Sequence, residues 1–261
     1  MSNHRTALVS SEARIASDVE IGPYVVVEDD VEVGEGTRIG ANVVLKSGLR
    51  LGSRVTVHEG AVLGGPPQDL KFMKSENVPS FAVVEDDSII REFATVHRSV
   101  RENGTTRVGR GCFVMGYGHI AHDCDIGDGA VIASYAALAG HIHVGRNAFI
   151  SGGVAIHQFS KIGELAMVGG GSKVNLDVPP FLTVDGVPAR AVGLNSVGLR
   201  RGGVSDEDVR ALKLAYRMLY REKRSLAEAL DLLEGLQNEL VGTLVAFIRG
   251  SERGVCRARA R

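Results

Sequence analysis

The 261-residue chain has no tryptophan, few other aromatic residues and only three cysteines. Each of these shortages excludes some classes of protein fold or site. Aromatic residues make up 5% of the sequence while glycine occurs 33 times, which favours a thin, regularly coiled core over a bulky globular one. Cys112, Cys124 and Cys256 form no CxxC spacing. Neither a disulfide framework nor a cysteine-based zinc site is therefore predicted.

The sequence also lacks an excess of charge and any long apolar run. Its formal net charge is −1 at pH 7, so overall charge indicates neither nucleic acid nor a membrane surface as a partner. No apolar stretch reaches the roughly 20 residues that a spanning helix needs, and the first ten residues lack the apolar segment of a signal peptide. We expect a cytoplasmic protein with no stable membrane insertion.

What the sequence does contain is an aliphatic residue at every sixth position. This spacing fits neither the helical period nor strand alternation, so it predicts a repeat architecture, a β-solenoid. Three hexapeptides would form one triangular coil, and coils would stack at the strand spacing of about 4.8 Å. The general rule for parallel connections predicts right-handed coils. The repeating residues are Ile15, Ile21, Val27, Val33, Ile39, Leu45, Leu51, Val57, Leu63, Val84, Ile90, Val96, Val108, Val114, Ile120, Ile126, Ile132, Leu138, Val144, Ile150, Ile156, Ile162, Val168 and Val174.

Loops at 64–83 and 98–106 interrupt the repeat, and helical patterns follow its end. Ser205 is predicted to cap one helix, and Ser225 forms a capping box with Glu228 before the next. A third helix is predicted from Glu239 to Ile248, and the basic tail is expected to fray. We predict two domains, a solenoid over residues 1–190 and a small C-terminal α-helical domain over residues 191–261.

Histidines gather where the stacking of eighteen-residue coils can be counted. His122 is expected to have Gly140 and Gln158 stacked on it, and Asp123 to lie beneath His141. A single histidine in such a turn is usually a hydrogen-bonded surface residue, but three on one edge beside a carboxylate favour a site. His122 and Asp123 have the components of a general base and its orienting partner. His157, above Ala139, completes the predicted edge.

The chemistry of this edge needs a second surface and an external nucleophile. No Ser, Cys or Thr is placed as a nucleophile, so direct attack on an acyl donor by a substrate hydroxyl is simpler. An edge of a prism is convex whereas ligand sites are concave, so the 64–83 loop or another subunit must close the cleft. A cyclic homo-oligomer supplies such a surface.

Five segments resemble one family: HIAHDC, ALAGH, VAIHQF, QDLKF and LNSVGLRR. It is the family of acyl-carrier-protein-dependent UDP-N-acetylglucosamine O-acyltransferases, the first enzymes of lipid A synthesis. The resemblance implies a left-handed parallel β-helix, in place of the right-handed coils, and a homotrimer with active sites between subunits. It also implies transfer of a 3-hydroxyacyl chain from acyl carrier protein to the 3-hydroxyl of UDP-GlcNAc.

The resemblance also implies roles for single residues. His122 would be the general base, Asp123 would orient it, and the Gly140 amide would stabilise the oxyanion. No metal or tightly bound cofactor is implied, because the acyl donor is the phosphopantetheine thioester on acyl carrier protein. The implied binding residues are His119, His141, His157 and Gln158 in the groove, Gln68, Asp69 and Lys71 at the sugar nucleotide, and Asn195 and Arg201 at the nucleotide or the phosphopantetheine.

Gly170 falls where this family measures acyl length, and its missing side chain should leave room for a longer chain. The sequence departs from the family pattern at three positions. Val197 stands where a glutamate is frequent, Gly202 where a second arginine often follows Arg201, and Pro188 where another residue can limit acyl length.

A basic stripe is predicted on the first long helix, and it fits docking of the acidic acyl carrier protein or a solvated face equally well. Three other functions stay open from the residues: a solenoid N-acyltransferase acting later in the pathway, a γ-class carbonic anhydrase with zinc on three histidines, and a non-catalytic scaffold. The ladder spacing of the histidines suits a groove better than one ion. The stripe comprises Arg210, Lys213, Arg217, Arg221 and Arg224.

Overall fold

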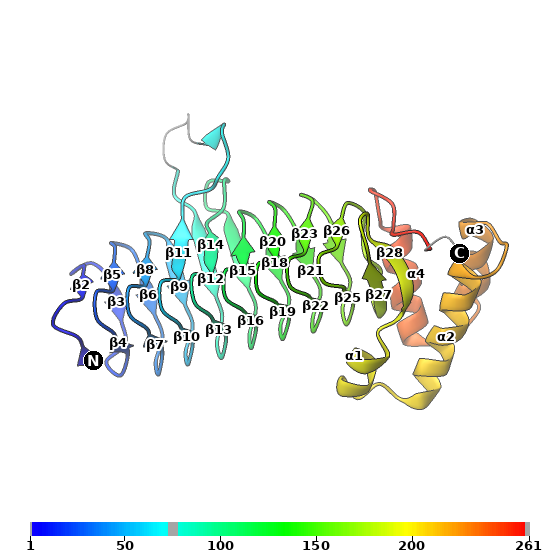
Figure 1. The fold of residues 1–261 in the computed structure, drawn as a ribbon, viewed down its shortest axis with the longest axis horizontal. Helices are drawn as coiled ribbons and strands as arrows, with labels where there is room; N and C mark the ends of the chain where they lie inside the picture. Colours follow the sequence, from blue (N-terminus) through cyan, green and yellow to red (C-terminus); the bar gives the residue numbers. More distant parts are fainter. Residues whose placement is uncertain (1, 73–77, 259–261) are drawn as a thin grey trace.

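The computed structural model describes residues 2–72 and 78–258, which form a three-sided prism of parallel strands followed by a group of helices (Figure 1). In this part of the chain the first sheet has 11 strands and carries the last strand, β28, antiparallel to β27. We call it sheet 1. Its strands, in spatial order, are β1 (Ser2–Asn3), β4 (Glu20–Ile21), β7 (Arg38–Ile39), β10 (Thr56–Val57), β13 (Ile89–Ile90), β16 (Phe113–Val114), β19 (Val131–Ile132), β22 (Phe149–Ile150), β25 (Met167–Val168), β27 (Leu182–Asp185) and β28 (Arg190–Leu194).

The other two sides of the prism are sheet 2, with nine strands, and sheet 3, with eight, over the same described residues. Sheet 2 contains β2 (Leu8–Val9), β5 (Val26–Val27), β8 (Val44–Leu45), β11 (Val62–Gly65), β14 (Thr95–His97), β17 (His119–Ile120), β20 (Ala137–Leu138), β23 (Ala155–Ile156) and β26 (Lys173–Val174). Sheet 3 contains β3 (Arg14–Ile15), β6 (Glu32–Val33), β9 (Leu49–Leu51), β12 (Phe81–Val84), β15 (Thr105–Val108), β18 (Asp125–Ile126), β21 (His143–Val144) and β24 (Lys161–Ile162).

The sixfold repeat works as predicted because the second residue of a two-residue strand points into the prism. In β18, for example, Ile126 is completely buried while Asp125 faces outward. Burying one such aliphatic side chain contributes about 1.5–3 kcal/mol, and the stacked residues form one continuous core. The turn at each corner places a residue in the left-handed region, Asp123 (φ 59°) and His141 (φ 62°) among them. This corner conformation sets the direction of the side chains at the site.

The register between coils shows where the two loops enter. A regular coil pairs residues eighteen apart, as in Asp125 with His143. The step grows to 33 residues across the first loop, where Thr56 pairs with Ile89, and to 24 across the second, where Thr95 pairs with His119. Both loops leave the prism on the same side, near β11 and β14 (Figure 1). Residues 73–77 of the predicted 64–83 loop lie outside the described residues.

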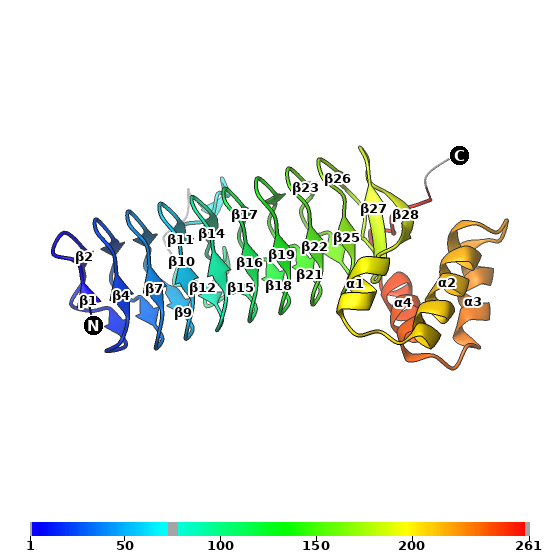
Figure 2. The same cartoon turned by 60° about the horizontal axis from the view of Figure 1, so that its bottom comes forward.

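Within the described residues, four helices follow the prism and lie at one end of it (Figure 2). They are α1 (Ser196–Arg201), α2 (Asp206–Tyr220), α3 (Leu226–Glu234) and α4 (Glu239–Arg249). The predicted caps are confirmed: the Ser205 side chain accepts from the Asp208 N–H, and Ser225 forms its capping box with Glu228. The short helix α1 was not predicted, because only Leu199 of its six residues is buried and no apolar pattern marks it.

The expectation of a frayed tail is wrong over the described residues. The Cys256 N–H donates to the Asp177 carbonyl, and the Ala191 N–H donates to the Arg257 carbonyl, so the chain returns from α4 to the end of the prism. The division of the chain at residue 190 stays a prediction, since β28 pairs with β27 across it. None of the helices in the described ranges is long and apolar enough to cross a bilayer.

Candidate active site

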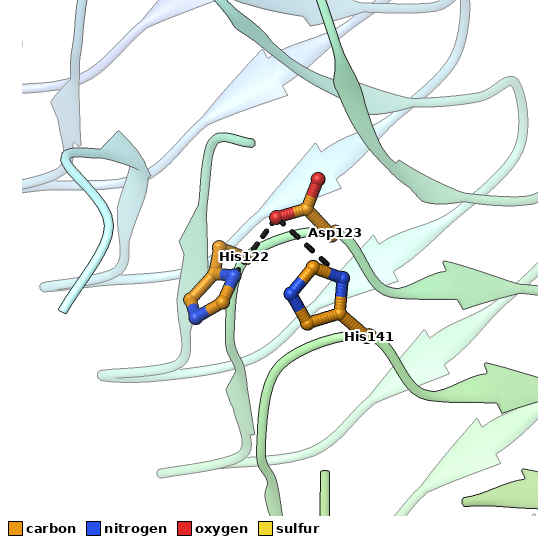
Figure 3. Close-up of side chains that lie close together, drawn as sticks. All are labelled: His122, Asp123 and His141. Carbon is orange, nitrogen blue, oxygen red and sulfur yellow. Dashed lines mark hydrogen bonds and ion pairs between the residues drawn. The ribbon is translucent and has the colours of Figure 1, made fainter. Parts of the chain in front are cut away.

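The predicted histidine edge lies where sheet 2 turns into sheet 3, and we call residues 121–124, 139–142 and 157–160 the His122 edge. Its stacking follows the predicted count: the His141 N–H donates to the His122 carbonyl, and the Phe159 N–H donates to the Gly140 carbonyl. Figure 3 shows His122, Asp123 and His141 converging from two successive coils. Nδ1 of His122 lies 2.8 Å from Oδ2 of Asp123 and forms a hydrogen bond with it.

Two groups of the second loop donate hydrogen bonds to the carboxylate of Asp123. The Ser99 hydroxyl donates to Oδ1 at 2.6 Å, and the Val100 N–H donates to Oδ2 at 3.2 Å. Burial alone would raise the pKa of Asp123, but the hydrogen bonds from His122, Ser99 and Val100 outweigh it and lower this pKa to about 2. Asp123 is therefore ionised across the physiological range and can hold the His122 ring in one orientation.

The His122 ring covers Gly140 one coil further along. A Cβ atom added to Gly140 would lie 2.6 Å from Nε2 of His122, so a side chain has no space there. Among the described residues, no backbone hydrogen bond uses the Gly140 N–H. Because Asp123 occupies Nδ1 of His122, the ring's other nitrogen is left to face a substrate beside this amide. A base and an oxyanion donor can thus serve one reacting carbonyl.

Three more histidines surround this pair. Burial lowers the pKa of His141, against the opposing effect of Asp123, and its Nδ1 lies 3.3 Å from the Arg101 guanidinium. Burial also lowers the pKa of His119, whose Nδ1 lies 2.8 Å from the Thr95 hydroxyl. Burial beside these rings lowers the pKa of His97 to about 4. These three rings are therefore neutral at pH 7 and suit hydrogen bonding rather than charge.

The remaining residues predicted for this edge are exposed. His157 and Gln158 both lie at the surface of the chain, one coil beyond Gly140. Nδ1 of His157 is 2.9 Å from Nη2 of Arg253, which belongs to the C-terminal tail.

The structure explains why the chain supplies no nucleophile at this edge. Burial raises the pKa of the Cys124 thiol to about 12, and its sulfur donates to the Ala139 carbonyl inside the prism. Ser160 is completely buried, and the Ser99 hydroxyl is engaged by Asp123. These three side chains are therefore not available as nucleophiles at this edge.

A metal ion suits the edge poorly. His122, Asp123 and His141 offer ligand atoms within 4.8 Å of one another, whereas His157 is outside this group. Arg101 places Nε 3.5 Å from the Asp123 carboxylate and Nη2 3.3 Å from Nδ1 of His141. This guanidinium puts a positive charge where a cation would be bound.

The first loop brings its predicted residues toward the edge. Asp69 caps its own turn by accepting from the Lys71 and Phe72 N–H groups, and these bonds, with His122 and Lys71 nearby, lower its pKa. Gln68 and Lys71 are exposed on the same turn. Asp69 is close enough to the edge to act on His141, whose pKa its charge raises against the larger effect of burial.

Asn195 and Arg201 lie elsewhere in the same chain. They line a cleft of about 410 Å³ between α1 and the outer face of sheet 1, which Val197 and Gly202 also line. The Asn195 side chain is buried: it accepts from the Gly198 N–H as the cap of α1 and donates to the Leu165 carbonyl. Of the two residues, Arg201 is the one whose side chain is exposed to a ligand.

Gly170 lies on a different edge from the histidines, between sheets 1 and 2, and we call residues 115–118, 133–136, 151–154 and 169–172 the Gly170 edge. A Cβ atom on Gly170 would be 3.5 Å from the Gly152 carbonyl oxygen, which is an ordinary contact, so a side chain fits there. A single chain does not bring Gly170 to His122.

The basic stripe is shorter than predicted. Helix α2 ends at Tyr220, so Arg210, Lys213 and Arg217 share the helix, while Arg221 is its C-cap and Arg224 lies beyond it. Glu222 accepts hydrogen bonds from Arg217 and Arg224, which is why these two side chains fold toward the helix end.

Four residues that contact the predicted site residues were not found from the sequence: Ser99, His97, Arg101 and Arg253. The first three lie in or beside the second loop, where the register step is 24 rather than eighteen, so a count by eighteen places them wrongly. The register after the loop would have placed Ser99 under Asp123. No sequence signal indicates that the C-terminal tail brings Arg253 back to the prism.

Comparisons with known proteins show which family the chain resembles. The family model described as UDP N-acetylglucosamine O-acyltransferase, domain 2, matches residues 177–256, and the bacterial transferase hexapeptide model matches residues 12–47. A relative from Sulfurihydrogenibium sp. is 54% identical over 255 residues, covering 97% of this chain and 93% of the relative. A relative from Trichlorobacter lovleyi is 50% identical over 266 residues, covering 98% and 100%. Both are named acyl-[acyl-carrier-protein]--UDP-N-acetylglucosamine O-acyltransferase.

Solved structures show the same fold. The UDP-N-acetylglucosamine acyltransferase from Bacteroides fragilis superposes with a TM-score of 0.94 at 36% identity, covering 97% of this chain and 99% of that one. An enzyme structure from Acinetobacter baumannii gives 0.91 at 34% identity with the same coverage.

The fold is a left-handed parallel β-helix of hexapeptide repeats, so the right-handed expectation is wrong. The general rule depends on the right-handed twist of long strands, and two-residue strands have little twist to impose.

Relatives at 50% and 54% identity over nearly the whole chain place it among acyltransferases. The chain belongs to the acyl-[acyl-carrier-protein]--UDP-N-acetylglucosamine O-acyltransferase family.

Proposed function

We propose that this protein transfers a 3-hydroxyacyl chain from acyl carrier protein to the 3-hydroxyl of UDP-GlcNAc, the first step of lipid A synthesis. The observation that carries the proposal is the pairing of His122 with Asp123 directly over the unused N–H of Gly140. The names of the relatives supply the substrates. A base beside an oxyanion donor is the arrangement that acyl transfer to a hydroxyl needs.

In the proposed mechanism His122 acts as the general base. Asp123 accepts a hydrogen bond from the Nδ1–H of His122, so Nε2 is free to take the proton of the sugar 3-hydroxyl as its oxygen attacks the thioester carbon. The Gly140 N–H stabilises the oxyanion that forms on the thioester oxygen. The carbon–sulfur bond then breaks, the ester carbonyl re-forms, and the protonated His122 returns the proton to the departing phosphopantetheine thiolate.

The outer face of sheet 2 supports the homotrimer that the resemblance implies. Its outward residues are largely apolar, whereas those of sheet 3 alternate in charge and pair with one another, as Arg50 does with Glu32. An apolar face of this kind is typical of a subunit interface. The outward sheet 2 residues in chain order are Leu8, Val26, Val44, Val62, Thr95, His119, Ala137, Ala155 and Lys173.

Threefold symmetry would complete the site. If sheet 2 of each subunit faces the axis, unlike edges meet, because the contact in a ring is heterologous. The His122 edge of one subunit would then lie against the Gly170 edge of the next. This packing would give the convex His122 edge the opposing wall that a ligand site needs, and would put Gly170 beside the acyl chain.

The other proposed contacts follow from charge and exposure. Lys71 and Gln68 would contact the sugar nucleotide beside Asp69, with His119, His141, His157 and Gln158 lining the groove. Arg201 would reach the nucleotide or the phosphopantetheine from the cleft at α1, with Asn195 holding that helix in place. We propose that the reaction uses no metal or bound cofactor, since Asp123 and Gly140 can supply orientation and charge stabilisation.

Acyl transfer by the purified chain tests this proposal. The assay would offer acyl carrier proteins loaded with 3-hydroxyacyl chains of several lengths, and UDP-GlcNAc, its 3-amino analogue or UDP-3-O-acyl-glucosamine as acceptors. We expect an ester product on the 3-oxygen of UDP-GlcNAc and a preference for a longer acyl chain. Transfer to UDP-3-O-acyl-glucosamine instead, or to neither sugar nucleotide, would contradict the proposal.

A further inference from the structure

The C-terminal tail is anchored to the prism next to the His122 edge. The Ser251 hydroxyl donates to the Asp177 carboxylate at 2.7 Å, and the Asp177 N–H donates to the Gly254 carbonyl at 3.0 Å. The Cys256 N–H closes the segment by donating to the Asp177 carbonyl at 2.8 Å. These bonds fix residues 251–256 without using the side chain between them, Arg253.

Arg253 reaches from this anchored segment to a groove histidine. Its Nη2 lies 2.9 Å from Nδ1 of His157, and its Nε donates to the Asn175 carbonyl at 3.0 Å. The second bond fixes the plane of the guanidinium. The contact therefore joins residues 96 positions apart in the sequence, and it is directional.

Two groups compete for the same nitrogen of His157. The Gln158 carbonyl oxygen lies 3.1 Å from Nδ1 and could accept a proton from it, whereas a guanidinium can only donate. Nδ1 cannot carry a proton for the carbonyl and a lone pair for Arg253 at the same time. The bond to Arg253 is shorter and assisted by a full charge, so it prevails, and Nδ1 must be the acceptor.

We propose that Arg253 is a positioning residue that holds His157 as the neutral tautomer with its proton on Nε2. The ring then presents a hydrogen-bond donor to the groove. This inference rests on the proposed function for its role, although the tautomer itself does not. The charged residues around this corner are Arg253, Lys161, Asp177 and Glu252, and Asp177 is already engaged by Ser251.

The group that faces Nδ1 thus gives the two histidines opposite roles: Nε2 is an acceptor in His122 and a donor in His157. The Asp123 carboxylate accepts from Nδ1 of His122, so Nε2 of this ring is the acceptor that a general base needs. The Arg253 guanidinium donates to Nδ1 of His157, so Nε2 of this ring carries the proton and is a hydrogen-bond donor. One edge would therefore hold a base and a fixed neutral donor within the same groove.

The test is the ¹⁵N spectrum of the imidazole nitrogens in the full-length protein labelled at histidine, with His157→Gln used to assign the signal. In the wild type we expect a protonated Nε2 and an unprotonated Nδ1. In Arg253→Met the proton should move to Nδ1, because the Gln158 carbonyl then becomes its partner. Arg253→Lys, which keeps a cationic donor at this position, should keep the wild-type tautomer. Arg257→Met, in the same tail, should leave the spectrum unchanged.

Steady-state kinetics distinguish a role of Arg253 in turnover from a purely structural role. Arg253→Met should lower kcat/KM about three- to tenfold, the worth of one hydrogen bond, and Arg257→Met should not. A protonated Nδ1 in the wild type would overturn the inference without any variant, and so would an unchanged tautomer in Arg253→Met. If the tautomers behave as expected but no acyl transfer occurs, the proposed function fails and the assignment of His157 stands.

Discussion

A Cβ atom placed on Gly140 would lie 2.6 Å from Nε2 of His122. The ring of the proposed base therefore occupies the space that a side chain at the proposed oxyanion donor would need. This relationship explains why a glycine stands at this corner. The main-chain N–H of Gly140 lies beside the His122 ring only because no side chain of residue 140 separates them. The imidazole can stand over the peptide only for the same reason.

Gly140→Ala should therefore lower kcat about 100-fold, since a displacement of a catalytic group by an ångström has effects of this size. The His122 ring would have to rotate away and weaken its bond to Asp123. Steady-state kinetics and thermal unfolding of the variant check this. Gly242→Ala, on the exposed side of α4, is the matched control, because a Cβ there meets nothing within 4 Å. Near wild-type turnover in Gly140→Ala would contradict the account.

The lowered pKa of Asp123 predicts a contribution to acid stability. Because the pKa is about 2 in the fold and 3.8 for the free side chain, the carboxylate stabilises the fold by about 2 kcal/mol. This contribution is complete above about pH 4 and is lost as the pH falls through 2. Asp123→Asn should lack it and unfold at a higher pH in an acid titration followed by circular dichroism. Glu102→Gln, an exposed residue of the same loop, should match the wild type.

Arg217 provides a test of docking by acyl carrier protein. Arg217→Glu should raise the KM for the acylated carrier about threefold or more at low ionic strength, with little change in the KM for UDP-GlcNAc. Added salt should reduce the difference, because screening weakens both attraction and repulsion. Arg38→Glu makes the same change of charge at the far end of the prism and should have no effect. Equal effects from the two variants would exclude α2 as the docking surface.

Gly170 tests the proposed contact between unlike edges. Gly170→Met should shift the product toward shorter acyl chains, because its side chain would project into the space beside the neighbouring His122 edge. The product distribution from a mixture of carrier-bound chains, resolved by mass spectrometry, measures this. An unchanged distribution would remove Gly170 as the residue that limits acyl length.

The sequence predicted the parts of the site that lie within regular coils. His122, Gly140 and Gln158 could be aligned by counting eighteen residues, because nothing is inserted between Ile120 and Ile162. Ser99 could not, because the second loop lengthens the step to 24. The contact of Arg253 with His157 depends on how the tail folds back onto the prism, which leaves no periodic signal.

Among the C-terminal helices, too, the sequence predicts some and misses one. Ser205 and Ser225 mark their helices through local cap chemistry, which a sequence displays directly. Helix α1 is held by Asn195, whose amide reaches the Leu165 carbonyl, and by packing of Leu199, neither of which has a local pattern.

The most direct test of the central claim is the turnover of His122→Ala, measured with acyl carrier protein and UDP-GlcNAc on material whose oligomeric state matches the wild type. General-base catalysis is worth about 10²–10⁴-fold, so kcat should fall by at least two orders of magnitude while the KM values change little. A variant that keeps its assembly and turns over within a few-fold of the wild type would show that His122 is not the base.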